Sequence, residues 1–398
     1  MTDYVLVNTP AEYARAVERL LAASGPVAVD AERASGYRYS QRAYLIQMFR
    51  RGAGTFLFDP IAVPRFDDLQ AGIRDEEWVL HAASQDLPCL REVGLDPRNI
   101  FDTELAARLL GMPRVGLAAV VEELLGITLA KKHSAADWST RPLPDSWLEY
   151  AALDVDLLVD VRDLLVTRLA AAGKTHIAAE EFNATLAKEA KPAAAEPWRR
   201  LSGIHALHNP RKLAIARELW LARETLAAEL DVSPGRLVPD TSLSSVAAAM
   251  PTSRSALAAL HTFTGRASRS ELERWWQAVE RGRTATPPAR HPPSEGPPPP
   301  RMWATRNPSA DIRLRLARES LTELAGRLSM PLENLLTPDY LRRVTWHPPH
   351  RVTTASINDQ LRALGARNWQ RNTIAAVIVE AFVHATQLTT LSGIEPGI

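Results

Sequence analysis

Two carboxylates near the N-terminus are spaced to work as a pair. Asp30 and Glu32 end the apolar string PVAVDAE at residues 26–32. Side chains alternate along a strand, which predicts Val27 and Val29 on one face and both acids on the other. Like charges side by side repel unless a cation lies between them, and a hard divalent ion takes oxygen ligands of this kind. The same Asp-x-Glu spacing is also typical of a solvated strand end, so further acids must decide.

A third acid, Asp86, lies in the string HAASQDLPCL at residues 81–90. Leu87 and Leu90 have helical spacing, and Pro88 is typical of a first helical turn, so we expect Asp86 at a helix N-terminus. The helix dipole stabilises an Asp at this position, so helix capping competes with metal binding as an explanation.

The fourth acid, Asp154, is on the apolar side of a helix predicted over residues 147–165. The other acids of this helix share the opposite, solvent-facing side: Glu149, Asp156, Asp160 and Asp163. An uncompensated charge among apolar side chains such as Leu158 is costly, so Asp154 needs a partner. A metal ion is one candidate, and a buried ion pair with an arginine is the alternative. Tyr150 lies one turn earlier, so its hydroxyl can reach the same site.

The elements around these acids alternate between strands and helices. Strands are predicted at residues 44–49 and 55–59, joined by the turn signal at 52–54. A strand with acids at its end, then hairpins, then helices is the arrangement of ribonuclease-H-like folds, although other α/β folds share the pattern.

Two stretches rich in proline or alanine, residues 188–196 and 284–300, divide the chain. Beyond the first stretch only helical periodicity remains. The string LARETL at 221–226 recurs as LARESL at 316–321, which predicts a duplicated helical module. The expected units are an α/β domain at 1–190, a helical module at 205–283, a Pro-rich linker at 284–304 and a second helical module at 305–398.

Composition limits the class of protein. The 398 residues are 46% apolar. No apolar run approaches the ~18 residues of a membrane span, and residues 1–10 lack the basic and apolar blocks of a signal peptide, so a cytoplasmic protein is expected. The single cysteine, Cys89, excludes an internal disulfide and a thiolate zinc site. Lys and Arg number 23 against 29 Asp and Glu in residues 1–200, and 24 against 17 in residues 201–398. An acidic half joined to a basic half suits a carboxylate metal site linked to modules that bind a polyanion.

Together these residues resemble the exonuclease motifs of the DEDD superfamily, and specifically of its ribonuclease D branch. The matching strings are DAE at 30–32, HAASQDLPCL at 81–90, FDT at 101–103, DWSTRPL at 137–143 and YAALD at 150–154. Tyrosine four residues before the last Asp marks the DEDDy subclass. Ala31 departs from the threonine that relatives often carry, and its side chain should point away from the metal. The resemblance covers roughly residues 1–175 and implies a ribonuclease-H-like exonuclease domain.

The resemblance also implies a mechanism. Two divalent ions, Mg²⁺ or Mn²⁺, would be held by four ligands: Asp30, Glu32, Asp86 and Asp154. Tyr150 would orient the attacking water, because an unperturbed tyrosine pKa of about 10 makes it a poor base. Asp102 would cap a helix or support the ligands.

The helical units resemble HRDC modules, the first over about residues 208–282 and the second, more divergent, from about residue 307. Their candidate nucleic-acid contacts are Arg211, Lys212, Arg342, Arg343, Arg367 and Arg371, with Trp275, Trp276 and Trp369. Phosphate contacts of this kind are insensitive to sequence. Solvated arginines and core tryptophans are the simpler alternative.

The predicted function is therefore a 3′-to-5′ exoribonuclease that trims free 3′ ends, with tRNA precursors as the family expectation. We expect a monomer without an obligate protein partner or a membrane. A 3′-5′ exonuclease acting on DNA is the first alternative, because it would use the same four carboxylates. A non-catalytic nucleic-acid scaffold and a hydrolase of small phosphoesters are the others.

Overall fold

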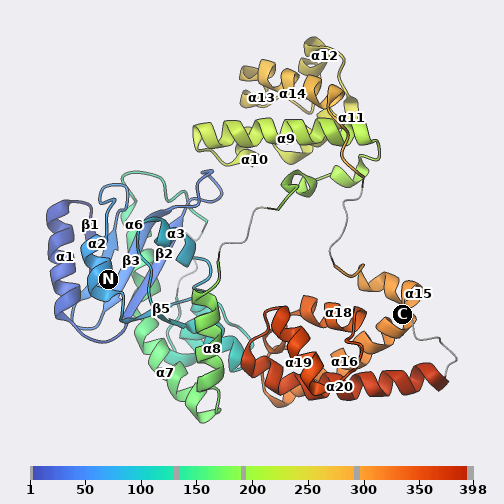
Figure 1. The fold of residues 1–398 in the computed structure, drawn as a ribbon. Coiled ribbons are helices and arrows are strands. Elements are labelled where there is room, and N and C mark those ends of the chain that lie inside the picture. The colour runs from blue at the N-terminus through green and yellow to red at the C-terminus, as the bar shows by residue number, and fades with distance from the viewer. Residues whose placement is uncertain (1–2, 130–134, 190–193, 291–295, 392–398) are drawn as a thin grey trace.

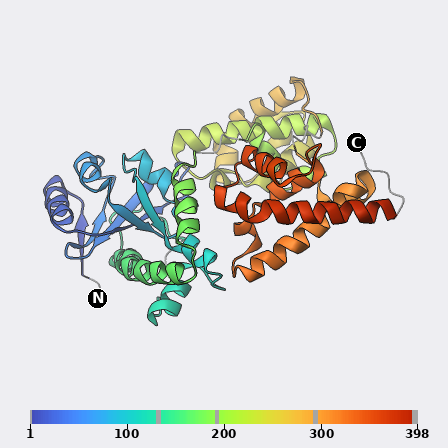
Figure 2. The same cartoon turned by 60° about the horizontal axis from the view of Figure 1, so that its bottom comes forward.

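The structure, a computed structural model, describes residues 3–129, 135–189, 194–290 and 296–391. Parts of the predicted linker and of both proline or alanine-rich stretches lie outside these ranges. The chain forms an α/β domain and two all-α bundles, which lie on the same side of the α/β domain (Figures 1 and 2). An α/β domain followed by two helical modules confirms the predicted fold class.

A six-stranded mixed sheet forms the centre of the first domain, in the order β1-β4-β3-β2-β5-β6. Its strands are β1 (Tyr4–Val7), β2 (Val27–Arg33), β3 (Ala43–Arg50), β4 (Gly54–Phe58), β5 (Glu77–Leu80) and β6 (Asn99–Asp102). β2 runs antiparallel to β3 and parallel to β5. The predicted strands and the turn between β3 and β4 are therefore confirmed.

Helices cover both faces of this sheet. They are α1 (Pro10–Ala22), α2 (Asp67–Ile73), α3 (Leu87–Glu92), α4 (Thr103–Leu109), α5 (Leu117–Leu125), α6 (Asp145–Asp156), α7 (Leu158–Ala171) and α8 (Thr175–Leu186). Val27 and Val29 of β2 are buried in one core with α1 and α2. Ala28, on the opposite face, packs with Val155 and Leu158 of α6 and α7. This second face carries the two acids of β2.

The helix predicted over residues 147–165 is wrong in one respect, because the chain breaks it at Leu157. α6 ends at Asp156 and α7 begins at Leu158. α6 packs on β2, β3 and β4, whereas α7 packs on β5 and β2. Two stretches that cover different strands of a twisted sheet need different axes, and helical periodicity alone does not reveal such a break.

The first bundle has its own core. Its elements are η1 (Pro197–Arg200), η2 (Ile204–Ala206), α9 (Pro210–Leu230), α10 (Pro234–Leu237), α11 (Asp240–Ala249), α12 (Arg254–Ala258), α13 (Arg266–Ser270) and α14 (Leu272–Thr284). The long helix α9 packs against α14 and α11. Trp275 of α14 is fully buried in this core. It is therefore a core tryptophan rather than a nucleic-acid contact.

The C-terminal bundle repeats this plan. Its elements are η3 (Pro300–Met302), α15 (Trp303–Arg306), α16 (Pro308–Arg327), α17 (Leu332–Leu335), α18 (Pro338–Trp346), α19 (Thr354–Ala363) and α20 (Asn368–Leu391). α9 and α16 both start with an Asn cap followed by proline, Asn209-Pro210 and Asn307-Pro308. The two copies of the repeated string thus occupy equivalent first helices.

Among the residues that the structure describes, α20 is the helix that meets the length and composition test for a membrane span. Over Asn368–Thr390 it is long and apolar enough by length and composition alone. However, Ile374, Ile378 and Phe382 are buried, and the helix packs against α16 and α19. A core helix passes the same test, and α20 has the contacts of one.

The Pro-rich linker does not keep the last module apart from the catalytic domain. The C-terminal bundle packs on the α/β domain through the start and middle of α8. The Lys174 ammonium group donates to the carbonyls of Leu109 and Leu328, both at 2.6 Å. Glu181, which is 4% exposed, pairs with Arg367. Apolar residues of both parts belong to one continuous core.

Contacts between the first bundle and the α/β domain are polar instead. The Asp231 carboxylate accepts from the Ser40 amide at 2.9 Å and from the Tyr44 hydroxyl at 3.3 Å. The Arg236 guanidinium lies 3.8 Å from the centre of the Tyr37 ring. The connector between α9 and α11 therefore touches the loop that follows β2.

Candidate active site

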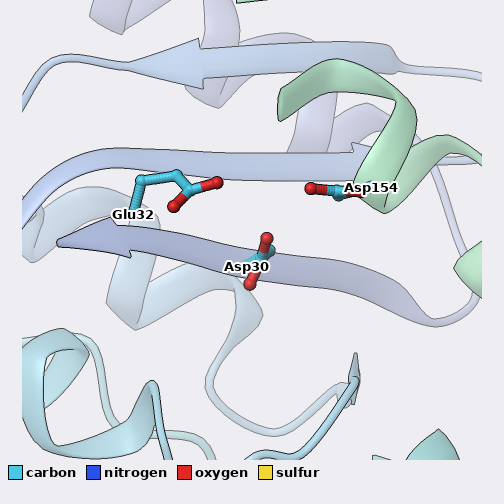
Figure 3. A group of neighbouring side chains, drawn as sticks. All are labelled: Asp30, Glu32 and Asp154. Carbon is cyan, nitrogen blue, oxygen red and sulfur yellow. The ribbon is translucent and has the colours of Figure 1, made fainter. Parts of the chain in front are cut away.

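Three predicted acids come together over the sheet. Asp30 and Glu32 project from β2, and Asp154 projects toward them from α6 (Figure 3). One carboxylate oxygen from each lies within 4.8 Å of the other two. The strand alternation and the helical position inferred for these residues are thus confirmed, and the three form a group that could hold a metal ion.

Asp86 joins the group from a different element. It is the residue that precedes α3, but its side chain does not cap the helix. Instead the Asp86 carboxyl group lies against that of Asp30, within reach of a hydrogen bond. Two carboxylates can lie this close only with a proton or a cation between them.

Electrostatics at the site favour a cation. Burial, and then the charge of Asp30, raises the pKa of Asp154 to about 8. Burial and the same neighbouring charge raise the pKa of Glu32 to about 10. Burial also raises the pKa of Asp86 well above its usual range. Oxygen donors that resist ionisation in each other's presence suit a hard divalent cation, whose charge would allow them to ionise together.

Tyr150 hydrogen-bonds with Asp154, one helical turn away on α6. Burial, with Asp154 and Glu32 nearby, raises the pKa of the Tyr150 hydroxyl above its usual value. The phenol therefore stays protonated near neutral pH, as a hydrogen-bond donor rather than a base.

α6 itself is held in place by a cluster beneath it. Trp138 is fully buried against Leu148 and Ala151 of α6. Arg141 fixes the loop that carries this tryptophan, because two of its guanidinium nitrogens donate to the Asp59 carboxylate at 2.7 and 2.9 Å. The string DWSTRPL thus positions the helix that bears Tyr150 and Asp154.

Asp102 does more than cap α4. Its carboxylate accepts from the amide of Leu105 at 3.1 Å, which is the capping contact. It also accepts from the amides of Ala82 and Ala83 at 3.1 and 2.9 Å. The Ala83 carbonyl in turn accepts from the Asp86 amide at 3.2 Å. Asp102 thus anchors the turn that presents Asp86.

A cavity of about 550 Å³ opens beside the carboxylates. Asp30, Tyr150 and Asp154 line one side. Apart from Arg114, the other walls are largely apolar and come mainly from the start of α5 and the residues before it: Val115, Gly116, Leu117, Ala118, Ala119, Leu129 and Leu158. His81 also faces the cavity and is bonded to Thr103 at 2.9 Å. Burial lowers the pKa of His81 to about 4, so its ring is neutral.

Asp156 was expected in solvent, and this expectation is wrong. It is half-buried and accepts a hydrogen bond from Thr55 of β4. Asp160 and Asp163, by contrast, remain near the surface and form ion pairs with Arg51. The break at Leu157 separates Asp156 from the acidic face that continuous periodicity predicted.

The predicted nucleic-acid contacts are largely engaged within the protein. Each of the five arginines in that set donates to an internal acceptor. Arg367 pairs with Glu181, and Arg211 donates to the carbonyls of Gly282 and Ala285. Trp369 is buried. These contacts favour structural roles, and nucleic-acid binding by this set stays a prediction.

Sequence comparison assigns a family to all three parts. Residues 4–170 match the family described as 3′-5′ exonuclease, residues 212–279 match the HRDC domain, and residues 296–382 match the 3′ to 5′ exonuclease C-terminal domain. Ribonuclease D of Escherichia coli (strain K12) is 32% identical over 254 residues, which are 63% of this chain and 67% of that protein. The chain belongs to the ribonuclease D family. It is accordingly a 3′-5′ exoribonuclease of the metal-dependent DEDD class.

Solved structures agree with this family. A crystal structure of a protein from Bifidobacterium adolescentis is 33% identical and covers 96% of this chain and 100% of its own, with a TM-score of 0.88. Escherichia coli RNase D, described as an exoribonuclease involved in structured RNA processing, is 25% identical, covers 97% and 99%, and gives a TM-score of 0.70. The likeness to ribonuclease D therefore extends over both helical bundles.

Sequence reasoning missed three contributors to this site. His81 and Arg141 lie inside the HAASQDLPCL and DWSTRPL strings, but their positions there did not indicate a role of their own. Arg33 follows Glu32 directly and lies 4.0 Å from Asp86, but a basic residue beside two acids gave no sign of that long-range contact.

Proposed function

We propose that this ribonuclease D family member trims the 3′ ends of structured RNAs, with tRNA precursors as the expected class. The observation that supports it most directly is the carboxylate group of Asp30, Glu32 and Asp154, joined by Asp86 through Asp30. This donor set stands in the domain that matches a 3′-5′ exonuclease. A cytoplasmic location and a monomeric state are part of the prediction.

The four acids would hold two divalent ions, Mg²⁺ or Mn²⁺. When bound, such ions acidify water and stabilise the charge that develops on the phosphate. The protein's own part is to bring four oxygen donors together from one strand and two helices. Tyr150 would orient the attacking water: its hydroxyl donates its proton to Asp154, and its oxygen would accept a hydrogen bond from the water.

The cavity beside the acids supports removal of single nucleotides. Its volume of about 550 Å³ and its apolar walls suit one base and sugar, with the acids at one side to meet the phosphate. A terminal nucleotide would end in this cavity, whereas an internal one would have to pass through it. The neutral His81 ring offers an uncharged wall to the base.

A matched set of oligonucleotides tests this function. RNA, DNA and RNA with a 3′ phosphate should be incubated with the full chain in Mg²⁺, in Mn²⁺ and in EDTA. We expect stepwise shortening of RNA from the 3′ end, abolished by EDTA and restored by added metal. Preferential shortening of DNA would favour the DNA exonuclease alternative. Binding without shortening in either metal would favour the scaffold, and undiminished cleavage in EDTA would remove the mechanism.

A further inference from the structure

Arg33 brings a positive charge to a site that otherwise gathers acids. It is the last residue of β2 and follows Glu32. A register shift between Glu32 and Arg33 interrupts the alternation of β2, and the Arg33 guanidinium lies 4.0 Å from the Asp86 carboxylate. The Arg33 side chain is 28% exposed, so a ligand that enters the site can reach it.

The Arg33 guanidinium is short of hydrogen-bond acceptors. In the part of the chain that the structure describes, it makes no hydrogen bond, and 4.0 Å to Asp86 is too long for one. Other arginines of the domain contrast with it. Arg50 donates to two carbonyls and to Glu76 over 2.6–3.1 Å, and Arg141 grips Asp59. A guanidinium has five N–H donors, and partial burial without acceptors is unfavourable unless a ligand supplies them.

Charge balance indicates which ligand that would be. This step rests on the proposed function. Two divalent ions would neutralise the four carboxylate ligands, so the Arg33 guanidinium would no longer be drawn to Asp86 and could bind an incoming anion. A phosphodiester carries one negative charge, and its two free oxygens match the paired N–H groups of a guanidinium. The Arg33 guanidinium therefore suits an RNA phosphate better than a third cation or a neutral ligand.

We propose that Arg33 is a substrate-binding residue that contacts the RNA phosphate at the cleavage site or the one immediately 5′ of it. In the absence of RNA its guanidinium lies near Asp86, and RNA supplies the acceptors that it lacks. The competing role is that of a counter-ion, in which Arg33 only offsets the crowded carboxylates. The two roles predict different effects of removing Arg33 on metal binding and on RNA binding. A counter-ion opposes metal binding, so its removal tightens metal binding and leaves RNA binding unchanged.

The test compares Arg33→Gln and Arg33→Lys with Arg65→Gln. Arg65 is exposed on the loop before α2 and pairs with Asp67, so its substitution removes the same charge away from the carboxylates. We expect Arg33→Gln to raise KM or lower kcat/KM for RNA by about 10- to 100-fold, which is typical of one lost charged hydrogen bond. Arg33→Lys should fall in between. The salt dependence of RNA binding should weaken by about 0.7 in slope, the value for one phosphate contact on a single strand.

Two further measurements separate this role from the alternatives. Calorimetric titration of the RNA-free protein with Mn²⁺ should give the wild-type affinity or a tighter one for Arg33→Gln, and thermal melts should show an intact fold. Wild-type kinetics with tighter metal binding would overturn the proposal in favour of the counter-ion. Weaker metal binding that accounts for the kinetic loss would overturn it as well. Wild-type protein that fails to shorten RNA in either metal would refute the proposed function instead, which is a distinguishable outcome.

Discussion

Asp154 lies on the sheet-facing side of α6, next to the buried side chains of Val155 and of Leu158 at the start of α7. An ionised carboxylate in this position needs a hydrogen-bond donor or a positive charge nearby. Tyr150 is such a donor, and the other neighbours, Asp30 and Glu32, are acids. Since the partners are mostly acids, a buried ion pair with an arginine is not what holds Asp154. Its surroundings are those of a metal ligand. Without a metal, the buried and clustered carboxylates destabilise the folded protein.

Asp154→Asn should reduce exonuclease turnover by several orders of magnitude while the fold survives, because the variant loses a charged ligand but keeps its shape. Glu149→Gln is the matched control, since Glu149 is exposed on the same helix. It should change rate and stability little, within about 0.5 kcal/mol. Tyr150→Phe should fall between the two if the hydroxyl only orients water. Single-turnover rates and thermal melts measure both effects. An Asp154→Asn protein that melts early but keeps its rate per folded molecule would contradict the assignment.

The raised pKa values predict how the metal-free protein responds to pH. In the unfolded chain Asp and Glu titrate near pH 4, at about 3.9 and 4.3. In the folded protein Asp154 titrates at about 8 and Glu32 at about 10. Between these limits the folded state binds more protons, so the free energy of unfolding falls as pH rises.

Thermal melts in EDTA at pH 6, 7, 8 and 9 should therefore show a declining Tm, and the increase in Tm on adding Mn²⁺ should grow over the same range. Metal replaces the protons that the carboxyl groups otherwise retain. The Glu32→Gln variant, which has no proton to lose at this position, should show a shallower decline. A metal-induced increase in Tm that stays constant with pH would contradict protonation of these carboxyl groups in the metal-free protein.

At the scale of elements, the turn between β5 and α3 is stabilised by a side chain from a neighbouring strand. Ala82 adopts φ 61°, in the left-handed region that disfavours residues with a Cβ atom. The Asp102 carboxylate, at the junction of β6 and α4, accepts from the amides on both sides of this strained residue. A parallel neighbour strand thus supplies the anchor for the helix that begins after Asp86.

Asp102→Asn should weaken metal binding as well as stability. The substitution replaces an acceptor oxygen by an NH₂ group, which faces amide donors that it cannot satisfy, at a cost of about 1–3 kcal/mol. Relaxation of the turn should displace Asp86, so calorimetry should report weaker Mn²⁺ binding and the rate should recover in part at high metal concentration. Glu104→Gln, two residues along in the first turn of α4, is the control and should leave metal binding unchanged. Equal metal affinity in both variants would show that Asp102 is only a helix cap.

Local periodicity explains which parts of the site could be predicted from the sequence. The alternation of β2 fixes Asp30 and Glu32 on one face, and the four-residue interval of a helix fixes Tyr150 beside Asp154. The break at Leu157 could not be predicted, because it depends on which strands α6 and α7 cover. The same holds for Asp102 and Arg33, whose partners lie on elements far away in sequence. The spacing of residues within one element predicts which side chains share a face, but it does not predict which residues of other elements contact them.

Across the whole molecule, the two bundles are joined to the catalytic domain in different ways. The C-terminal bundle shares a continuous apolar core with it, and the interface buries the charged groups of Lys174 and Glu181. The HRDC bundle has a separate core and touches the catalytic domain through polar contacts such as Asp231 with Ser40. Apolar burial, rather than position in the chain, therefore decides which parts stabilise each other.

We expect calorimetry of the full chain to resolve two transitions, one for the HRDC bundle and one shared by the catalytic domain and the C-terminal bundle. Glu181 makes the shared transition testable, because it accepts from Arg367 and from the Trp369 indole nitrogen at 2.8 Å. Glu181→Gln should lower the free energy of unfolding for the shared transition by about 1–3 kcal/mol. The HRDC transition should stay at its wild-type temperature. Glu319→Gln, on the exposed side of α16, is the charge-matched control and should move neither.

Deletion of residues 284–398 extends the same test. The remaining protein would expose the apolar side of α8 around Ile177 and would leave Lys174 without the Leu328 carbonyl that it contacts from the C-terminal bundle. The catalytic domain should then melt at a lower temperature and be cut by protease sooner, even though its four carboxylates are intact. Loss of RNA binding in such a truncated protein would thus report instability as well as lost contacts, and only the Glu181→Gln comparison separates the two. If the truncated catalytic domain instead melts at the temperature of the full chain, the C-terminal bundle is a tethered module, and the shared core does not couple the two parts.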